Sequence, residues 1–154
     1  VKGNHDYWWN SVSKIRKVLP KDFFVIQNDA IKFGDVIICG SRLWNLTNQS
    51  LADKKINERE KIRLKLSLDC ALKLKDGVDR IVAMCHYPPF DATLNDSEYT
   101  AMFENCGVHS VVYGHLHGKD CRAVKYFEKN AVKYFLTSCD QVDNKLIKVL
   151  SVNL

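Results

Sequence analysis

The segment RIVAMCHYPPF, residues 80–90, consists of an apolar run that is followed directly by a histidine and, two residues later, by two prolines. Residues 80–85 form a continuous apolar run of the kind found in a strand that is covered on both faces of a sheet. His86 follows at once, and Pro88 and Pro89 prevent further strand pairing because proline has no backbone N–H. The segment therefore predicts a buried strand that carries a histidine at its carboxyl end.

A second segment repeats this arrangement further along the chain. Residues 110–113 form another apolar run, which leads into GHLHG at 114–118. The two glycines of that turn allow the backbone to bend sharply, so that His115 and His117 can face one crevice. Strands of an α/β sheet open onto a common crevice at their carboxyl ends, so we expect the two segments to lie side by side.

The rest of the sequence alternates helical and strand patterns, which predicts a mixed α/β fold in a single domain over 1–154. The spacing of apolar residues predicts a helix over 8–19, a long helix over 50–75 and a short helix over 97–105. Short β-rich runs predict additional strands at 23–27, 30–33, 36–39, 121–127, 131–137 and 146–152.

The predicted helix over 50–75 carries both an apolar ridge and many charges. The predicted ridge consists of Ile62, Leu64, Leu66, Leu68 and Leu72. Opposite charges three residues apart, such as Glu60 and Arg63, indicate ion pairs on the solvent side. We therefore interpret the charged run 53–63 as the solvated face of this helix.

The composition excludes several classes of protein. Of the 154 residues, 46% are apolar and 27% are charged, which excludes a disordered chain. No uncharged apolar run approaches the ~18–20 residues that cross a bilayer, so no membrane partner is expected. The net charge is +5, but the basic residues are dispersed, so a nucleic-acid partner is possible and unsupported. Six cysteines without a C-x-x-C pair indicate reduced, buried thiols and a cytoplasmic location.

Four of the five histidines share one predicted context. His5, His86, His115 and His117 each follow, or are expected to follow, the carboxyl end of an apolar run. One such histidine is most often an ordinary loop residue, but four at equivalent positions favour a metal site. Imidazole with amide or carboxylate oxygen suits first-row ions such as Mn, Fe, Ni or Zn. His109 precedes a strand without such company, and we interpret it as structural.

Three motifs, in their order and spacing, resemble the last three signature blocks of the calcineurin-like metallophosphoesterases. They are GNHD at 3–6, the strand-terminal His86, and GHLH at 114–117. The fuller pattern of GNHDYWW, GSRxW, HYPPF and YGHLHG is similar to one bacterial branch of predicted phosphohydrolases. The resemblance covers essentially the whole chain and implies an α-β-β-α sandwich of two mixed sheets flanked by helices.

The resemblance implies a centre with two divalent metal ions. It assigns Asn4, His86 and His115 as ligands of one metal and His117 as a ligand of the other. Two cations ~3.5–4 Å apart can clamp a phosphoryl group and lower the pKa of water enough to make hydroxide the nucleophile. The implied activity is therefore metal-dependent hydrolysis of phosphate esters.

The resemblance also implies catalytic roles for residues that do not bind metal. His5 matches the histidine that donates a proton to the leaving group, and Asp6 matches its orienting partner. An imidazole with a carboxylate behind it is a suitable acid near neutral pH. Arg42 is the predicted substrate contact, because a guanidinium can bind phosphate through two parallel hydrogen bonds.

Two earlier family motifs, D-x-H and G-D-x-x-D, do not occur in the 154 residues. In the family they supply the other ligands of the second metal and the carboxylate that bridges both. We therefore expect the chain to be the C-terminal portion of a catalytic domain, without its N-terminal strands and with little activity in isolation. The alternative function is a catalytically incomplete metal- or phosphate-binding fragment. An exposed sheet edge would also favour oligomers.

Overall fold

The computed structural model describes residues 1–47 and 50–153. These residues form three helices and six strands, so the predicted mixed α/β class is confirmed. In chain order they are α1 (Val12–Val18), β1 (Ile31–Phe33), β2 (Val36–Ser41), α2 (Leu51–Leu74), β3 (Arg80–Cys85), α3 (Glu98–Asn105), β4 (Val108–Tyr113), β5 (Tyr126–Lys129) and β6 (Val132–Leu136).

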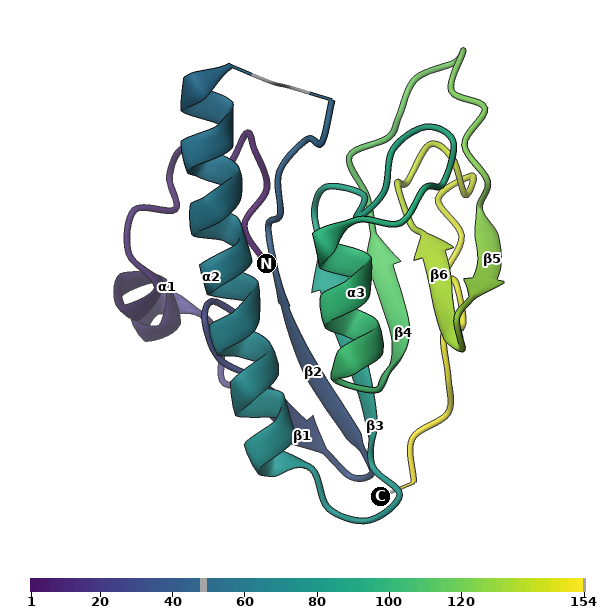
Figure 1. The fold of residues 1–154 in the computed structure, drawn as a ribbon. Coiled ribbons are helices and arrows are strands. Elements are labelled where there is room, and N and C mark those ends of the chain that lie inside the picture. The colour runs from purple at the N-terminus through teal and green to yellow at the C-terminus, as the bar shows by residue number, and fades with distance from the viewer. Residues whose placement is uncertain (48–49, 154) are drawn as a thin grey trace.

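The six strands lie in one mixed sheet with the order β1-β2-β3-β4-β6-β5. The four central strands β2, β3, β4 and β6 are mutually parallel, and the edge strands β1 and β5 are antiparallel to their neighbours. The carboxyl ends of the parallel strands therefore meet at one edge, in the upper half of Figure 1, close to the N-terminus. The described residues thus contain one of the two sheets that the sandwich prediction includes.

Helices α2 and α3 cover the same face of this sheet (Figure 1). Strand residues alternate between the two faces, and those toward the helices are the more deeply buried. The core on this face includes Ile37, Cys39, Leu64, Leu68, Ile81, Ala83, Phe103, Val111 and Tyr134. On the opposite face Ile38 and Val112 are half-buried and Met84 is exposed. The sheet thus has a partly exposed apolar face, and β1 forms one of its two edges. Oligomerisation through that edge stays a prediction.

Helix α2 begins where the sequence predicts, because Ser50 Oγ accepts a hydrogen bond from Asp53 N at 3.1 Å and caps the helix. The predicted ridge is correct at Leu64 and Leu68, which are fully buried. It is wrong at the flanking positions, since Ile62, Leu66 and Leu72 are exposed. At about 100° per residue, positions 62 and 66 lie about 160° from Leu64 and point away from the sheet.

The charged run of α2 contains one buried member, which corrects the prediction of a fully solvated face. Glu60 is 0% exposed. Its carboxylate accepts hydrogen bonds from Ser41 Oγ at 3.0 Å, Arg42 Nη2 at 3.0 Å and Arg63 Nη1 at 2.7 Å. Glu60 lies four residues before Leu64 and therefore occupies the same buried stripe. Lys61 pairs with Glu58 at 2.5 Å on the solvent side, as predicted.

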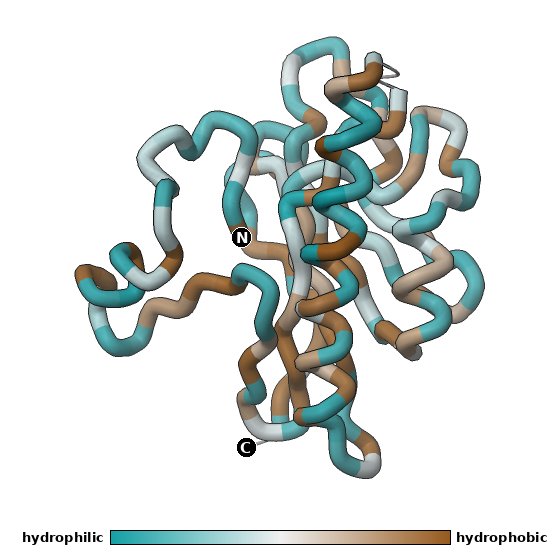
Figure 2. The backbone as a smooth tube through the Cα atoms, turned by 60° about the vertical axis from the view of Figure 1, so that its left-hand side comes forward, coloured by the Kyte–Doolittle hydropathy of each residue, from teal (hydrophilic) through white to brown (hydrophobic). Residues whose placement is uncertain are grey.

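The predicted strand at 23–27 is wrong, because this segment is irregular. Phe23 and Phe24 are exposed, and the Phe24 ring meets Phe33 edge to face at 5.2 Å. The Val25 carbonyl accepts a hydrogen bond from Arg16 Nη2 at 2.9 Å instead of joining a strand ladder. The segment and α1 project from the side of the molecule, away from the apolar central strands (Figure 2).

Other predicted boundaries also differ from the structure. The helix predicted over 8–19 begins only at Val12, after a tight turn through Trp8 and Trp9. Strand β5 begins only at Tyr126, later than predicted. The strand predicted at 146–152 does not form.

The six cysteines agree only in part with the prediction of reduced, buried thiols. All six are free. Cys39 and Cys85 are buried, whereas Cys139 is exposed, so the prediction of a buried side chain is wrong at that position. Among residues 1–47 and 50–153, no helix combines the length and apolar character needed to cross a membrane.

Candidate metal centre at the carboxyl edge of the sheet

Three residues from distant parts of the sequence converge at the carboxyl edge of the sheet. His86 Nε2 lies 2.7 Å from Asn4 Oδ1 and 3.2 Å from His115 Nδ1. His86 directly follows β3, and His115 follows β4 after a single glycine. The structure brings these three residues together, as a shared strand edge predicts.

The turn that contains Asn4 closes tightly against His86. A Cβ atom on Gly3 would lie 3.3 Å from Asp6 Oδ2 and 3.3 Å from His86 Nδ1, so a side chain at this position would crowd both groups. Gly3 N donates a hydrogen bond to Asp6 Oδ2 at 2.7 Å. The turn can approach His86 closely because residue 3 has no side chain and donates its N–H to Asp6.

His115 has a strained backbone. Its φ is 66°, in the left-handed region that favours glycine over other residues. The turn is held on both sides, because Gly114 N donates to His86 O at 3.2 Å and Leu116 N donates to Gly114 O at 2.8 Å. Strained residues of this kind concentrate at ligand and catalytic sites. The turn thus presents the imidazole to the edge at a conformational cost.

The imidazoles of His86 and His115 lie close to each other and to other basic side chains. Burial, followed by the positive charge of His115, lowers the pKa of His86 to about 4 against a smaller opposing effect of Asp6. Burial also lowers the pKa of His115, with additional lowering by His117 and His5. Both rings are therefore neutral at pH 7 and keep a nitrogen lone pair for binding. Metal ligation requires the neutral form of imidazole.

The distances of Asn4 Oδ1 and His115 Nδ1 from His86 Nε2 are compatible with ligands that share one metal ion. Ligands at about 2.1 Å from a shared ion lie about 3.0 Å apart at right angles and about 3.4 Å apart at tetrahedral angles. The separations of 2.7 and 3.2 Å are close to this range. Two imidazole nitrogens and an amide oxygen suit Mn, Fe, Ni or Zn. Within the described part of the chain, no three His, Cys, Asp or Glu side chains are arranged to hold an ion, so Asn4 is needed to complete the trio.

His117 lies at the margin of this cluster. Its ring is exposed, and its centroid is 6.4 Å from that of His115. Asp140 Oδ2 accepts a hydrogen bond from Gly118 N at 2.7 Å, and this bond lowers the pKa of Asp140. The charge of His117 lowers that pKa further. Asp140 therefore holds the loop of His117, a role that no sequence pattern indicates.

His5 and Asp6 lie on the same turn as Asn4. The His5 ring is exposed, and its centroid is 6.1 Å from that of Tyr7. Among the described contacts, Asp6 bonds to Gly3 N and not to His5. The predicted orienting contact between the two side chains is thus not formed in this structure, and their catalytic roles stay predictions.

Arg42 lies beneath the cluster, beside the loop of His86. Its guanidinium donates to buried Glu60 and lies 4.8 Å from the centroid of the Trp44 ring. Its backbone oxygen accepts from Tyr87 N at 2.9 Å, and the Tyr87 ring packs on His115 with centroids 4.2 Å apart. Sequence reasoning missed Glu60, although its position on the helical stripe of α2 is the signal that identifies it.

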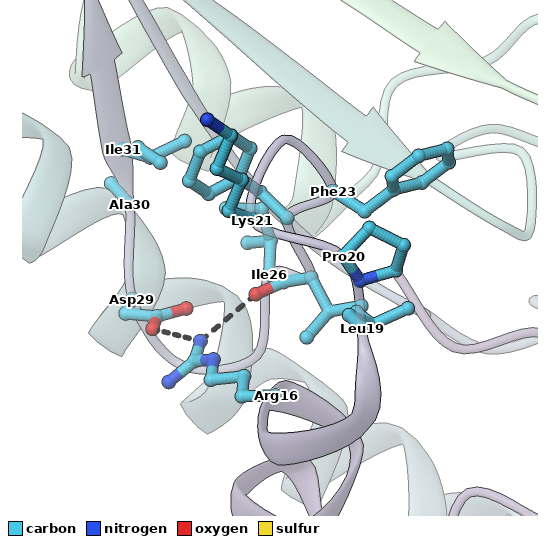
Figure 3. A pocket seen from close by; sticks show the side chains of 11 residues that line it. Arg16, Leu19, Pro20, Lys21, Phe23, Ile26, Asp29, Ala30 and Ile31 are labelled. Carbon is cyan, nitrogen blue, oxygen red and sulfur yellow. Dashed lines mark hydrogen bonds and ion pairs between the residues drawn. The ribbon is translucent and has the colours of Figure 1, made fainter.

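One of the hollows in the described structure borders the histidine cluster. A cavity of about 590 Å³ is lined by Tyr87 and His115, among others. A hollow of about 330 Å³ lies between α1 and β1 (Figure 3). There Arg16 pairs with Asp29 and donates to Val25 O, so its charge is already compensated. The second hollow has no histidine in its lining.

The fold and the edge cluster define an α/β protein with imidazoles where this class binds its ligands. The family model of the calcineurin-like phosphoesterases matches residues 1–119, which include all three histidine motifs. The match spans most of the chain, and the protein belongs to the calcineurin-like phosphoesterase family. Comparisons with curated proteins and with solved structures give no match.

Proposed function

We propose that residues 1–154 form the C-terminal portion of a catalytic domain that hydrolyses phosphate esters with two divalent metal ions. The observation that carries the proposal is the position of His86 Nε2, which lies 2.7 Å from Asn4 Oδ1 and 3.2 Å from His115 Nδ1. Membership of the calcineurin-like phosphoesterase family supports the same activity. Six free cysteines support a reducing compartment such as the cytoplasm.

The proposed ligands of one ion are Asn4, His86 and His115, and His117 is the proposed ligand of the second. Ions bound there, such as Mn, Fe, Ni or Zn, would polarise the phosphate ester and lower the pKa of water. The residues of the chain contribute orientation. Tyr87 packs on His115 at 4.2 Å and restricts rotation of its ring.

His5 is the proposed proton donor to the leaving oxygen. Its imidazole is exposed, yet it lies close enough for its charge to lower the pKa of both His86 and His115. Asp6 shares the turn and closes it through Gly3, so it would position His5 through the backbone. Proton donation to an alkoxide leaving group is typically worth ~10²–10⁴ in rate.

Arg42 is the proposed phosphate contact. Its guanidinium already donates to Glu60, but Nε is buried and has no hydrogen-bond partner among the described residues. An unpaired guanidinium donor next to His86 is a suitable partner for an anionic oxygen. Glu60 holds the guanidinium in place, and a substrate would reach the buried Nε only after a shift of the Arg42 side chain.

The test compares two esters in the catalytic domain completed by its D-x-H and G-D-x-x-D segment. We expect His5→Ala to slow hydrolysis of an alkyl phosphate far more than that of p-nitrophenyl phosphate, because p-nitrophenolate hardly needs a proton to leave. Bound metal, measured by elemental analysis, is expected to stay unchanged. Equal losses on both esters together with loss of metal would make His5 a ligand and contradict the assignment.

A further inference from the structure

A cavity of about 590 Å³ opens beside the histidine cluster and shares Tyr87 and His115 with it. Its walls come from the loops that follow β2, β3 and β4, so one edge of the sheet builds both features. Pockets that bind small molecules typically measure about 300–1,000 Å³. The cavity is therefore large enough for an organic group held next to His115.

The floor of the cavity is aromatic and closely packed. Phe90 is 5% exposed and Tyr113 is 1% exposed, and their rings meet edge to face at 5.2 Å. Tyr113 Oη donates to Val124 O at 3.3 Å, so the hydroxyl proton is already used within the protein. Leu94 and Leu116 add apolar walls. The polar side chains of the lining bond to one another, Thr47 to Asn45 and Thr93 to Asp91, so few groups are left for the hydroxyls of a sugar ring.

The two charged side chains of the cavity wall form hydrogen bonds with neighbouring residues of the chain. Asp91 accepts hydrogen bonds from Thr93 and Asn95, and these bonds lower the pKa of its carboxyl to about 2. Arg122 is exposed and donates to Lys119 O at 3.3 Å. Apart from these two and His115 of the histidine cluster, the described lining contains no acidic or basic side chain. A ligand group with several charges would thus lose water without gaining partners.

We infer that the cavity binds the alcohol part of a phosphate ester and that this part is a bulky apolar group, an alkyl chain or fused aromatic rings. The inference rests on the proposed function, which places the phosphate at the histidines. A dry cavity of about 150 Å³ holds one benzene molecule. The cavity of about 590 Å³ therefore has room for several times that apolar volume.

The test is a series of n-alkyl phosphates (ethyl, butyl, hexyl and octyl) titrated into the chain with Mn²⁺ by calorimetry. Burying one methylene is worth about 0.8 kcal/mol, so we expect affinity to rise about fourfold for each added methylene until the cavity is filled. Inorganic phosphate provides the reference without an alkyl group. An affinity that does not change along the series would overturn the inference.

A pair of variants locates the effect. Val124 lines the cavity but is 48% exposed, so Val124→Asp places a charge in the wall without disrupting the core. This variant is expected to lose the dependence on chain length and to bind inorganic phosphate as before. Val78→Asp is the matched control, because Val78 is 88% exposed and does not line the cavity. An undiminished dependence in Val124→Asp would place the alkyl chain elsewhere and contradict the inference.

A further arm separates this inference from the proposed function. His86→Ala is expected to abolish the binding of inorganic phosphate in Mn²⁺, while octanol still enters the cavity. If inorganic phosphate binds with Mn²⁺ and chain length has no effect, the inference on the alcohol fails and the proposed function stands. If chain length matters but neither Mn²⁺ nor His86 does, the cavity is correct and the proposed function fails.

Discussion

Both ends of the central sheet are polar, but the groups at the amino end are paired charges, whereas those at the carboxyl end are neutral metal-binding groups. At the amino end, Arg80 Nη2 pairs with Asp35 Oδ2 at 2.5 Å, and Asp35 also accepts hydrogen bonds from Asn153 N at 2.8 Å and Nδ2 at 2.9 Å. Lys32 pairs with Asp79 at 2.5 Å. These groups complete one another and need no ligand.

At the carboxyl end, the groups around His86 are uncharged, and each of them has a nitrogen or oxygen atom that can bind a metal ion. The nearest side-chain atoms to its Nε2 are Asn4 Oδ1 and His115 Nδ1. Hydrogen bonds join these groups in pairs, whereas a cation can bind all three together. Polarity alone therefore does not make a sheet edge a candidate site. The edge becomes a candidate when its polar groups can all bind the same ligand.

The largest expected effect concerns the buried charges of Glu60, Arg42 and Arg63 beneath the carboxyl end of the sheet. Glu60→Gln removes a charge that is 0% exposed and leaves Arg42 and Arg63 with a weaker partner. Breaking a buried pair costs about 3–5 kcal/mol, and we expect about 3 kcal/mol because Arg63 is partly exposed. Urea unfolding measures this loss. Glu58→Gln on the exposed side of α2 is the control, and equal losses in the two variants would contradict a structural role for Glu60.

A comparable effect is expected on catalysis when an edge histidine is removed. His115→Ala in the completed catalytic domain should lower the hydrolysis of alkyl and p-nitrophenyl phosphates together, because a metal ion acts on every ester alike. The loss should exceed the roughly 10–100-fold that outer-shell partners of a metal contribute. Unchanged turnover of both esters would separate the cluster from the reaction.

A smaller effect is expected at the amino end. Arg80→Ala removes the ion pair with Asp35 and a hydrogen bond to Ser151 O at 2.7 Å. The pair is partly exposed, so we expect a loss of about 1 kcal/mol in the free energy of unfolding. Binding of Mn²⁺, measured by calorimetry, should not change. A loss of metal binding in this variant would mean that the two ends of the sheet are coupled.

The smallest effect is a shift in acid sensitivity. Hydrogen bonding from Asn153 and pairing with Arg80 lower the pKa of Asp35, and the bond from Lys32 lowers that of Asp79. The native state thus binds these protons less readily than the unfolded state, so the stabilisation is present above the ordinary carboxyl pKa. It is lost as pH falls through the lowered values, between about pH 5 and pH 1.

Asp35→Asn is the variant that isolates this contribution. Its free energy of unfolding should fall less steeply with acid than that of the wild type, as measured by urea titrations at pH 7 and at lower pH. Asp143→Asn, at an exposed loop position, is the control. Identical acid dependence in wild type and Asp35→Asn would contradict the assigned pKa.

The sequence predicts best those elements whose signal is local and unambiguous. The strand at Arg80–Cys85 is correct to the residue, because a continuous apolar run ends at a histidine and two prolines. The segments 23–27 and 146–152 have similar β-rich composition, yet they are irregular. Their backbone groups bond to side chains such as Arg16 and Arg80, and composition does not reveal whether a neighbouring strand is in reach.

The same division holds for the site. Asn4, His86 and His115 can be brought together from sequence because strand ends meet at one edge. Asp140 cannot, since it lies 22 residues from Gly118, beyond the β5–β6 hairpin, and both residues are in loops without a pattern. Glu60 is an intermediate case: the charge pattern of α2 suggests solvent, while its helical position indicates burial. Position on the stripe proves the better guide.

The most direct test of the contrast between the two ends is the affinity of the chain for Mn²⁺, measured by calorimetry. His86→Ala changes the carboxyl end, and His109→Ala changes the amino half of β4, where His109 Nδ1 lies 2.8 Å from Ser110 Oγ. We predict that the wild type and His109→Ala bind Mn²⁺ alike and that His86→Ala binds at least about 10–100-fold more weakly. Equal binding by all three proteins, or equal loss in both variants, would contradict a metal centre at the carboxyl edge.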